Sequence, residues 1–178
     1  MSFLVNRVPS HIGYVVDDLE KAAHDWATRL GAGPFYVVER VKFDAISHYE
    51  APCIFDHSPA FGQWGHKVIE LQQVYEISPP TLKEKLIPGV TPIVNHISYL
   101  TTTPEEDSAD LSAAGYELFL HAKLGPVEVR FHDTRGILGQ SIEIHRQCEY
   151  LQGFFEMLAG EASRWDGKNP LRIAGKLN

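Results

Sequence analysis

Residues 11–34 of the chain, HIGYVVDDLEKAAHDWATRLGAGP, decide the fold. The stretch begins with six residues rich in β-branched and aromatic side chains, which predicts a short strand over 11–16. Asp17 and Asp18 follow and can cap a helix over 19–30, where apolar side chains recur with a period of 3.6 residues. Glycines after this segment predict its end. The stretch therefore predicts a strand followed by an amphipathic helix that packs on a sheet.

The rest of the first half predicts three more strands. A second strand is expected over 35–43 and a fourth over 67–73. Residues 44–65 are expected to form a long loop that leads into a third strand near 55–62. A proline-rich connector follows, with a short helix expected around 81–86. The order of the first half is therefore strand, helix and three strands.

The second half repeats the first. HISYL at 96–100 matches HIGYV at 11–15, and QSIEIHR at 140–146 matches KVIELQQ at 67–73. The first pair of motifs is 85 residues apart and the second pair is 73 residues apart, so the first half carries an insertion of 12 residues in its long loop. Because the unit occurs twice, the two copies can share one site between them.

The elements between the repeated motifs keep the same order. A helix is expected from Pro104, with Thr102 or Thr103 as its cap. Strands are expected over 116–121 and 126–132, before the repeated motif that ends the second half. The second half therefore also predicts a strand, a helix and three strands.

We expect one structural domain with four parts. These are a first βαβββ module, a connector, a second βαβββ module and a C-terminal helical extension, at residues 1–78, 79–94, 95–147 and 148–178. The extension predicts an amphipathic helix followed by a polar segment.

The composition excludes several classes of protein. A hydrophobic fraction of 44% in 178 residues is enough for a folded core. A net charge of −7 without a basic run argues against nucleic-acid and membrane-surface partners. The chain has no apolar run long enough for a membrane span or a signal peptide. The two cysteines, Cys53 and Cys148, are interpreted as reduced thiols, and we expect a cytoplasmic protein.

Four residues at duplicated positions are candidate metal ligands. Side chains alternate along a strand, so each repeated strand has one apolar face, and its other face carries a strong ligand type. The four candidates are His11, Glu70, His96 and Glu143. Imidazoles and carboxylates in the middle of a sheet must be paired or must bind a cation. Two of each suit one divalent ion such as Zn, Ni, Co, Mn or Fe.

The chain resembles the vicinal oxygen chelate superfamily, which includes glyoxalase I and methylmalonyl-CoA epimerase. The resemblance covers about residues 9–147. It is carried by HIGYVVDDLEKAAHDW at 11–26, VIEL at 68–71, NHISYL at 95–100, AAGYEL at 113–118 and VRFHDTRGILGQSIEIHR at 129–146. The resemblance implies an α+β fold in which paired βαβββ modules form a curved, cup-like mixed sheet with flanking helices. It also implies that the four candidates hold one divalent metal ion.

The resemblance leaves the reaction open. Glu70 stands where glyoxalases have glutamate and epimerases usually have glutamine, whereas the AAGYEL and FHDTR segments are more similar to the epimerase branch. It implies a divalent-metal-dependent isomerase, epimerase or lyase that acts on a carbonyl-containing substrate through an enediolate-type intermediate. Glu70 or Glu143 would both hold the metal and move the proton. The alternatives are a non-haem iron dioxygenase of the same superfamily and a metal-free small-molecule-binding protein.

Further candidates lie in the insertion and near it. A hairpin turn near Trp64 would place His57 and Phe61 on the face of Glu70, with His57 as a base or a substrate contact. His48 and Glu50 are further candidates for substrate binding.

Aromatic residues of the insertion suggest the nature of the substrate. Phe61 and Trp64, with Tyr49 and Phe55, would make the mouth of the pocket apolar, which favours a hydrophobic or acyl substrate. Arg130 is a candidate contact for an anionic group. The expected partners are this small molecule and a second copy of the chain in a homodimer, which the resemblance implies.

Overall fold

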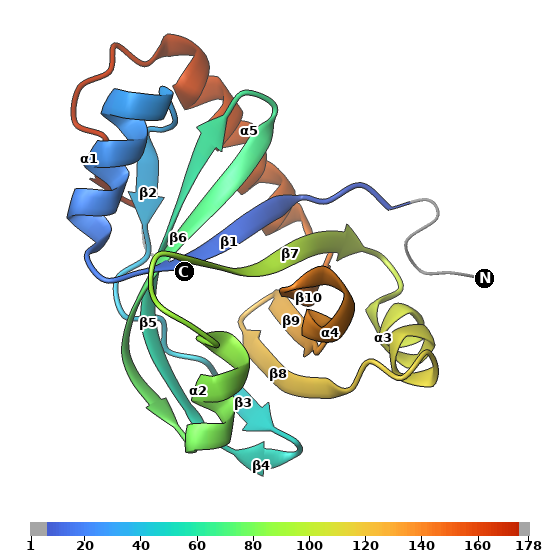
Figure 1. Ribbon diagram of the computed structural model, residues 1–178. Coiled ribbons are helices and arrows are strands. Elements are labelled where there is room, and N and C mark those ends of the chain that lie inside the picture. Colours follow the sequence, from blue (N-terminus) through green and yellow to red (C-terminus); the bar gives the residue numbers. More distant parts are fainter. Residues whose placement is uncertain (1–6, 175–178) are drawn as a thin grey trace.

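The strands form one mixed sheet of eleven strands in the computed structural model, which describes residues 7–174 (Figure 1). The elements in chain order are β1 (His11–Val16), α1 (Leu19–Leu30), β2 (Phe35–Val37), β3 (Ala45–His48), β4 (Ala51–Pro52), β5 (Ile54–Trp64), β6 (Lys67–Ser78), α2 (Pro80–Leu86), β7 (Ile93–Thr101), α3 (Pro104–Ala113), β8 (Leu118–Leu124), β9 (Val127–His132), α4 (Arg135–Leu138), β10 (Ser141–Arg146), α5 (Glu149–Arg164) and β11 (Leu171–Ile173).

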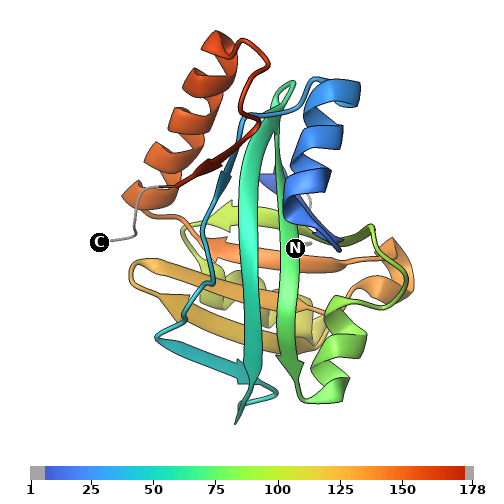
Figure 2. The same ribbon diagram turned by 90° about the vertical axis from the view of Figure 1, so that its left-hand side faces the viewer.

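The sheet has the internal symmetry that the repeated motifs predict. Its strand order is β11-β2-β5-β6-β1-β7-β10-β9-β8-β3-β4. β1 runs parallel to β6, β7 runs parallel to β10, and the antiparallel pair β1–β7 joins the halves at the centre. The sheet ends at β11 and β4 without closing into a barrel, and helices flank it (Figure 2). The predicted α+β fold is confirmed.

The helix α1 forms where the apolar periodicity predicts it. The carboxylate of Asp18 accepts a hydrogen bond from the backbone N–H of Lys21 at 2.9 Å, which caps the helix. Gly31 ends it with a φ of 67°, a left-handed conformation that glycine adopts without strain. Leu19 and Ala23 then pack against Ile69 in a core cluster on the outer face of the sheet.

The connector between the halves packs against the second half. The predicted short helix is present as α2, whose Leu82 and Leu86 are buried with Phe119 and Phe131 in a second core cluster. The connector therefore contributes core residues and links β6 directly to β7. The division of the chain at 1–78, 79–94, 95–147 and 148–178 stays a prediction.

The strand predicted over 35–43 is wrong beyond its first residues. β2 ends at Val37, and Arg40 has a φ of 51°, which regular strands do not contain. The backbone N–H groups of Val38 and Val41 still donate to the carbonyls of Pro59 and His57, both at 2.9 Å. The segment therefore follows β5 irregularly without forming a ladder.

The long loop predicted over 44–65 is also wrong. The insertion forms β3 and β4, joined by a turn in which Tyr49 and Glu50 have positive φ values of 47° and 66°. β3 pairs with β8 of the second half. The insertion, which belongs to the first half in sequence, therefore covers the free edge of β8. The third strand expected near 55–62 is present as the longer β5, which pairs with β6 along its length.

The C-terminal extension contains more structure than predicted. The amphipathic helix is present as α5, but the segment after it, predicted as a polar extension, includes β11. β11 pairs in parallel with β2 at the edge of the first half. Figure 2 shows α5 and α1 on opposite sides of the long β5–β6 pair, so α5 lies on the inner side of the curved sheet.

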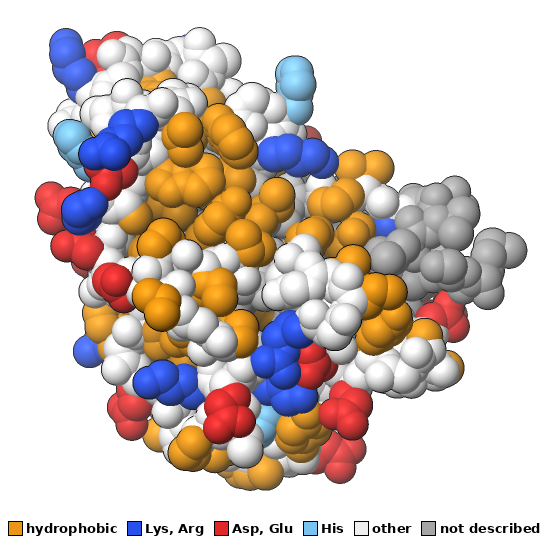
Figure 3. All heavy atoms as spheres, viewed as in Figure 1, with side chains coloured by type: hydrophobic (Ala, Val, Ile, Leu, Met, Phe, Trp, Pro, Cys, Tyr) orange, Lys and Arg blue, Asp and Glu red, His pale blue; other side chains and the backbone are white. Residues whose placement is uncertain are grey.

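One part of the outer face keeps hydrophobic side chains in contact with solvent. Ile12, Tyr14 and Trp26 pack only partly buried against the first core cluster, and Trp64 is 43% exposed. Figure 3 shows hydrophobic side chains gathered on this face, over the first half of the molecule. Among the helices described, none is long and apolar enough to cross a membrane. The cytoplasmic location stays a prediction.

Candidate metal centre

The four candidate ligands come from the four central strands. His11 lies on β1, Glu70 on β6, His96 on β7 and Glu143 on β10. In the ladder, Glu70 and His96 stand opposite Gly13, on either side of it, and Glu143 stands opposite Ser98. The parallel pairing of each outer strand with its central neighbour therefore brings all four side chains to one point of the inner face.

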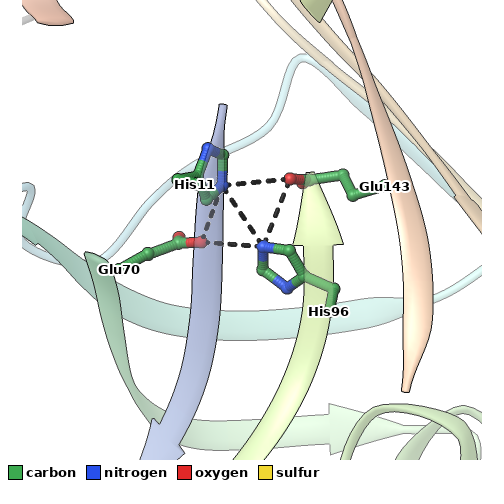
Figure 4. Close-up of side chains that lie close together, drawn as sticks. All are labelled: His11, Glu70, His96 and Glu143. Atoms are coloured by element: carbon green, nitrogen blue, oxygen red, sulfur yellow. Dashed lines mark hydrogen bonds and ion pairs between the residues drawn. The ribbon is translucent and has the colours of Figure 1, made fainter. Parts of the chain in front are cut away.

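The ligand atoms of the four residues converge (Figure 4). Nε2 of His11 lies 3.3 Å from Oε2 of Glu70 and 3.3 Å from Oε2 of Glu143. Nε2 of His96 lies 3.1 Å and 3.3 Å from the same two oxygens. The two Nε2 atoms are 3.3 Å apart, and all four ligand atoms lie within 4.8 Å of one another.

This donor set fits a divalent cation. Zinc binds histidine nitrogen and carboxylate oxygen at about 2.0–2.2 Å, and tetrahedral ligand atoms at that distance are about 3.3–3.6 Å apart. Two imidazole nitrogens that face each other need a proton or a metal ion between them. Two carboxylates also balance the charge of one divalent ion.

The buried charges shift one another's pKa values. Burial alone would lower the pKa of His11, but hydrogen bonds to Glu143 and Glu70 outweigh it and raise that pKa to about 9. Burial alone would raise the pKa of both carboxyl groups, but the histidines hold each pKa well below its usual range. The carboxylates are therefore ionised and available to a cation at neutral pH.

Neighbouring polar groups orient the ligands. Nδ1 of His96 lies 2.6 Å from Oδ1 of Asn95, so Nδ1 carries the proton and the lone pair of Nε2 faces the centre. Nδ1 of His11 lies 3.3 Å from the hydroxyl of Ser10. The amide of Gln72 donates to Oε1 of Glu70 at 2.9 Å. Each interaction occupies one polar atom of the imidazole or carboxylate. The other polar atom of the same group then points to the place where the four ligand atoms converge.

Gly13 is required by the centre although it is no ligand. A Cβ atom at this position would lie 2.1 Å from Cε1 of His96, closer than any two nonbonded carbon atoms approach. The missing side chain therefore provides the space that the imidazole of His96 occupies. Its counterpart in the repeated motif is Ser98, where a side chain is accommodated.

A mainly apolar cavity opens beside the centre. Counting its open mouth, it encloses about 850 Å³. Aliphatic and aromatic side chains of β5, β8, β9 and α5 make up most of its wall. The lining residues are His11, Val38, Val41, Phe43, Phe55, His57, Pro59, Phe61, Glu70, Gln72, Leu120, Ala122, Leu124, Val127, Val129, Phe131, Glu143, His145, Tyr150, Leu151, Phe154 and Phe155. The cavity therefore joins the four ligands to a site for a small molecule.

His57 lies in the wall of the cavity. Its ring stacks on Phe55 with centroids 3.9 Å apart, and its Nδ1 lies 3.3 Å from the carbonyl oxygen of Phe55. Burial lowers the pKa of this imidazole, so the ring is neutral at pH 7. Because a carbonyl only accepts hydrogen bonds, Nδ1 carries the proton and Nε2 has a free lone pair.

Comparison with known proteins places the chain in a family. Residues 10–134 match the model of the Glyoxalase/Bleomycin resistance protein/Dioxygenase superfamily, which is more than half of the chain. The chain belongs to this superfamily. This superfamily includes the vicinal oxygen chelate enzymes that the sequence resembles. The resemblance is therefore confirmed. None of the curated proteins compared matches the chain.

Solved structures support the fold of the superfamily. A hypothetical protein from Bacillus halodurans C-125 is 17% identical with a TM-score of 0.57, covering 81% of this chain and 96% of its own. Methylmalonyl-CoA epimerase from Mycobacterium tuberculosis is 15% identical with a TM-score of 0.54, covering 84% and 96%. Another methylmalonyl-CoA epimerase, solved with methylmalonyl-CoA and NH4+, is 16% identical with a TM-score of 0.51, covering 80% and 96%.

The structure brings only some of the predicted site residues to the cavity. His57 and Phe61 line it, whereas His48, Glu50, Trp64 and Arg130 do not. The ring of His48 is held by the carbonyl of Phe119 and the hydroxyl of Thr81, at 2.7 and 3.1 Å. It therefore ties the insertion to the second half.

The other three predicted contacts lie outside the cavity. Glu50 is exposed in the turn between β3 and β4, and Trp64 packs against Trp26 of α1 with centroids 5.6 Å apart. Arg130 is paired with Glu128 at 2.7 Å and with Glu105 at 3.1 Å. All three lie away from the ligand face, so we retain none of them as a substrate contact.

The residues selected from the sequence leave out three features of the site. Gln72 and His145 line the cavity, and each contacts a ligand carboxylate two residues earlier in its strand, at 2.9 Å to Glu70 and 2.8 Å to Glu143. Their spacing of two residues places them on the ligand face, and that signal was available. The aromatic wall from α5 had no such signal, because tertiary packing alone determines where the tail docks.

Proposed function

We propose that the protein is a divalent-metal-dependent isomerase, epimerase or lyase that moves a proton next to a substrate carbonyl. The observation that carries the proposal is the convergence of two imidazoles and two carboxylates at the wall of an apolar cavity, where each histidine Nε2 lies 3.1–3.3 Å from both carboxylate Oε2 atoms. Membership of the superfamily supports the same class of chemistry.

The chain's own residues divide the work. His11, Glu70, His96 and Glu143 would hold the ion, and Asn95 with Gln72 would keep two of these ligands oriented. Bound there, a divalent ion such as Zn, Ni, Co, Mn or Fe supplies a Lewis acid that polarises a carbonyl and favours enediolate-type chemistry.

Two kinds of proton acceptor line the cavity. Nε2 of His57 has a free lone pair, and the neutral ring is ready to take a proton from carbon. Glu70 and Glu143 are ionised carboxylates in the same cavity and are the second candidates. Either kind of group would take a proton from the carbon next to the carbonyl and return it, as the proposed reactions require.

The apolar wall excludes water from the reacting atoms. Side chains such as Phe55, Phe61 and Phe131 surround the approach to the ligands. Loss of water strengthens the electrostatic interactions of the buried charges and favours a substrate with an apolar body. A small hydrophobic or acyl compound therefore fits this site.

Metal content and isotope exchange test the proposal. We expect about one divalent ion per chain in protein purified without chelator. In D2O, we expect that the metal-loaded protein exchanges the carbon-bound proton next to the carbonyl of racemic benzoin, detected by mass spectrometry. Chelation should abolish the exchange, and His57→Gln should slow it by about 100-fold or more. A protein that binds none of the five metals after incubation would overturn the proposal.

We also propose a homodimer. The hydrophobic side chains on the outer face, including Ile12, Tyr14 and Trp64, support association through this surface (Figure 3). Light scattering should then give twice the chain mass of 20.0 kDa. A mass of one chain at micromolar concentration would contradict the dimer without affecting the proposed chemistry.

A further inference from the structure

The walls of the cavity define the substrate more closely than the metal centre does. Among the described residues that line the cavity there is neither a lysine nor an arginine. Its acidic residues are Glu70 and Glu143, both buried. A phosphate or carboxylate of the substrate that did not reach the metal would therefore be desolvated with no lysine or arginine beside it, which disfavours its binding.

The C-terminal helix supplies a large part of the apolar wall. Phe154 of α5 packs edge-to-face on Phe61 with centroids 5.5 Å apart, and Phe155 packs in the same manner on His11 at 5.9 Å. This helix lies beyond the residues that the superfamily model matches, which end at 134. The apolar lining beside His11 is therefore supplied in part by a helix that follows both modules of the fold.

Two lining residues, Gln72 and His145, each have a buried polar atom without a hydrogen-bond partner. Gln72 is 3% exposed, and its amide nitrogen donates to the carboxylate of Glu70, which can only accept. This bond fixes the orientation of the amide, so the other atom is the carbonyl oxygen Oε1. Oε1 is buried and accepts no hydrogen bond. A buried acceptor without a partner is unfavourable, and a donor on a bound molecule would remove that penalty.

Resting on the function proposed above, we propose that the substrate is an uncharged, largely apolar carbonyl compound with a hydroxyl group that donates to Oε1 of Gln72. The same walls disfavour organic acids and acyl thioesters whose acyl part carries a carboxylate, because that group would find no lysine or arginine among the described lining residues. Gln72 is then a specificity-determining residue, and the apolar side chains of α5 contact the body of the substrate.

A matched series of benzophenones tests the substrate class. The probes are 4-hydroxybenzophenone, 4-methoxybenzophenone and the anion 4-benzoylbenzoate, with methylmalonyl-CoA as a fourth. Binding is measured by calorimetry on the full chain as purified and again after chelation, since a carboxylate can reach the metal directly. We expect the hydroxyl compound to bind about 2- to 10-fold more tightly than the methoxy compound, the value of one hydrogen bond. The two anionic probes should bind at least about 10-fold more weakly to the chelated protein.

Two variants separate selectivity from a structural effect. Gln72→Met should abolish the preference for hydroxyl over methoxy while apolar binding persists. Gln152→Met, on the exposed side of α5, should leave the preference unchanged. Irradiation of bound 4-hydroxybenzophenone attaches it to nearby C–H bonds, and peptide mapping should place the label on residues 149–158 or on β5.

The outcomes distinguish this inference from the proposed function. Equal binding of the hydroxyl and methoxy probes, a preference that survives Gln72→Met, or tight binding of methylmalonyl-CoA to the chelated protein would each overturn the substrate class. Such results would leave metal content and proton exchange unaffected. Conversely, a protein that selects the hydroxyl probe but binds no metal would retain this inference as a binding property and remove only the proposed chemistry.

Discussion

The two halves of the sheet contribute the same ligand pair but different surroundings. β1 and β6 provide His11 and Glu70, while β7 and β10 provide His96 and Glu143. Around these pairs the halves differ. The first half has the insertion and the long antiparallel strand pair β5–β6, whereas the second half has shorter strands that pack under α3. Duplicated positions thus form the metal centre, while strands of both halves together with α5 form the wall of the cavity.

The outer faces differ in the same way. The first half exposes part of an apolar surface around Tyr14 and Trp26, whereas Glu128, Arg130 and Arg146 of the second half form ion pairs on its outer face. The shared fold therefore tolerates different surfaces, because only the inner face must bring the ligands together. Substitutions at matched positions of the two halves can separate what the centre requires from what each half adds.

The largest effect is expected for one ligand from each half. His11→Ala and Glu143→Ala should each weaken metal binding by more than about 100-fold, because each removes one of the four candidate ligands. Metal content per chain and competition with a chelator measure the loss. His24→Ala on the exposed face of α1 is the control and should bind metal like the unmodified protein. Full metal content in either ligand variant would contradict a four-ligand centre.

A smaller contrast is expected between Gly13 and its counterpart Ser98. Gly13→Ala places a Cβ atom 2.1 Å from the present position of the His96 ring, so the ring must move. We expect about 10- to 100-fold weaker metal binding and a loss of stability of about 1–3 kcal/mol. Ser98→Ala removes a buried hydroxyl that has no partner and should change stability by less than about 1 kcal/mol. Chelator competition and urea unfolding of both variants measure the contrast, and equal effects at the two positions would contradict it.

The sequence predicted what repeats and missed what occurs once. The four ligands were found because strand alternation and duplication point to the same positions, and the fold followed from the repeated order of elements. The strand expected over 35–43 failed because the turn at Arg40 depends on contacts with β5. The insertion was taken for a loop because β3 finds its partner, β8, some 70 residues later in the chain. Docking of α5 over the cavity depends on tertiary packing in the same way.

The ion pairs of the second half predict a pH-dependent contribution to stability. Burial alone would raise the pKa of Glu128, but hydrogen bonds from Arg146 and His121, both at 2.8 Å, lower it to about 2. The ionised form is therefore the one that stabilises the fold, fully above pH 4.5 and progressively less as the pH falls towards 2. Glu128→Gln should cost about 1–2 kcal/mol at pH 7 and much less at pH 3. Urea unfolding at both pH values tests this, and a pH-independent difference would contradict it.

The smallest effect concerns the helices that follow the two central strands. Asp18 caps α1 through its side chain, whereas Thr103 at the start of α3 makes no side-chain cap hydrogen bond. Asp18→Ala should therefore destabilise the protein by about 1 kcal/mol, because the N–H of Lys21 loses its acceptor. Asp18→Asn retains a capping oxygen and should be nearly neutral, and urea unfolding compares the two. Since α1 packs on the outer face, away from the ligands, metal content should stay unchanged in both variants. Equal stability of the alanine and asparagine variants would show that the core contacts of Leu19 and Ala23 hold the helix start without the cap.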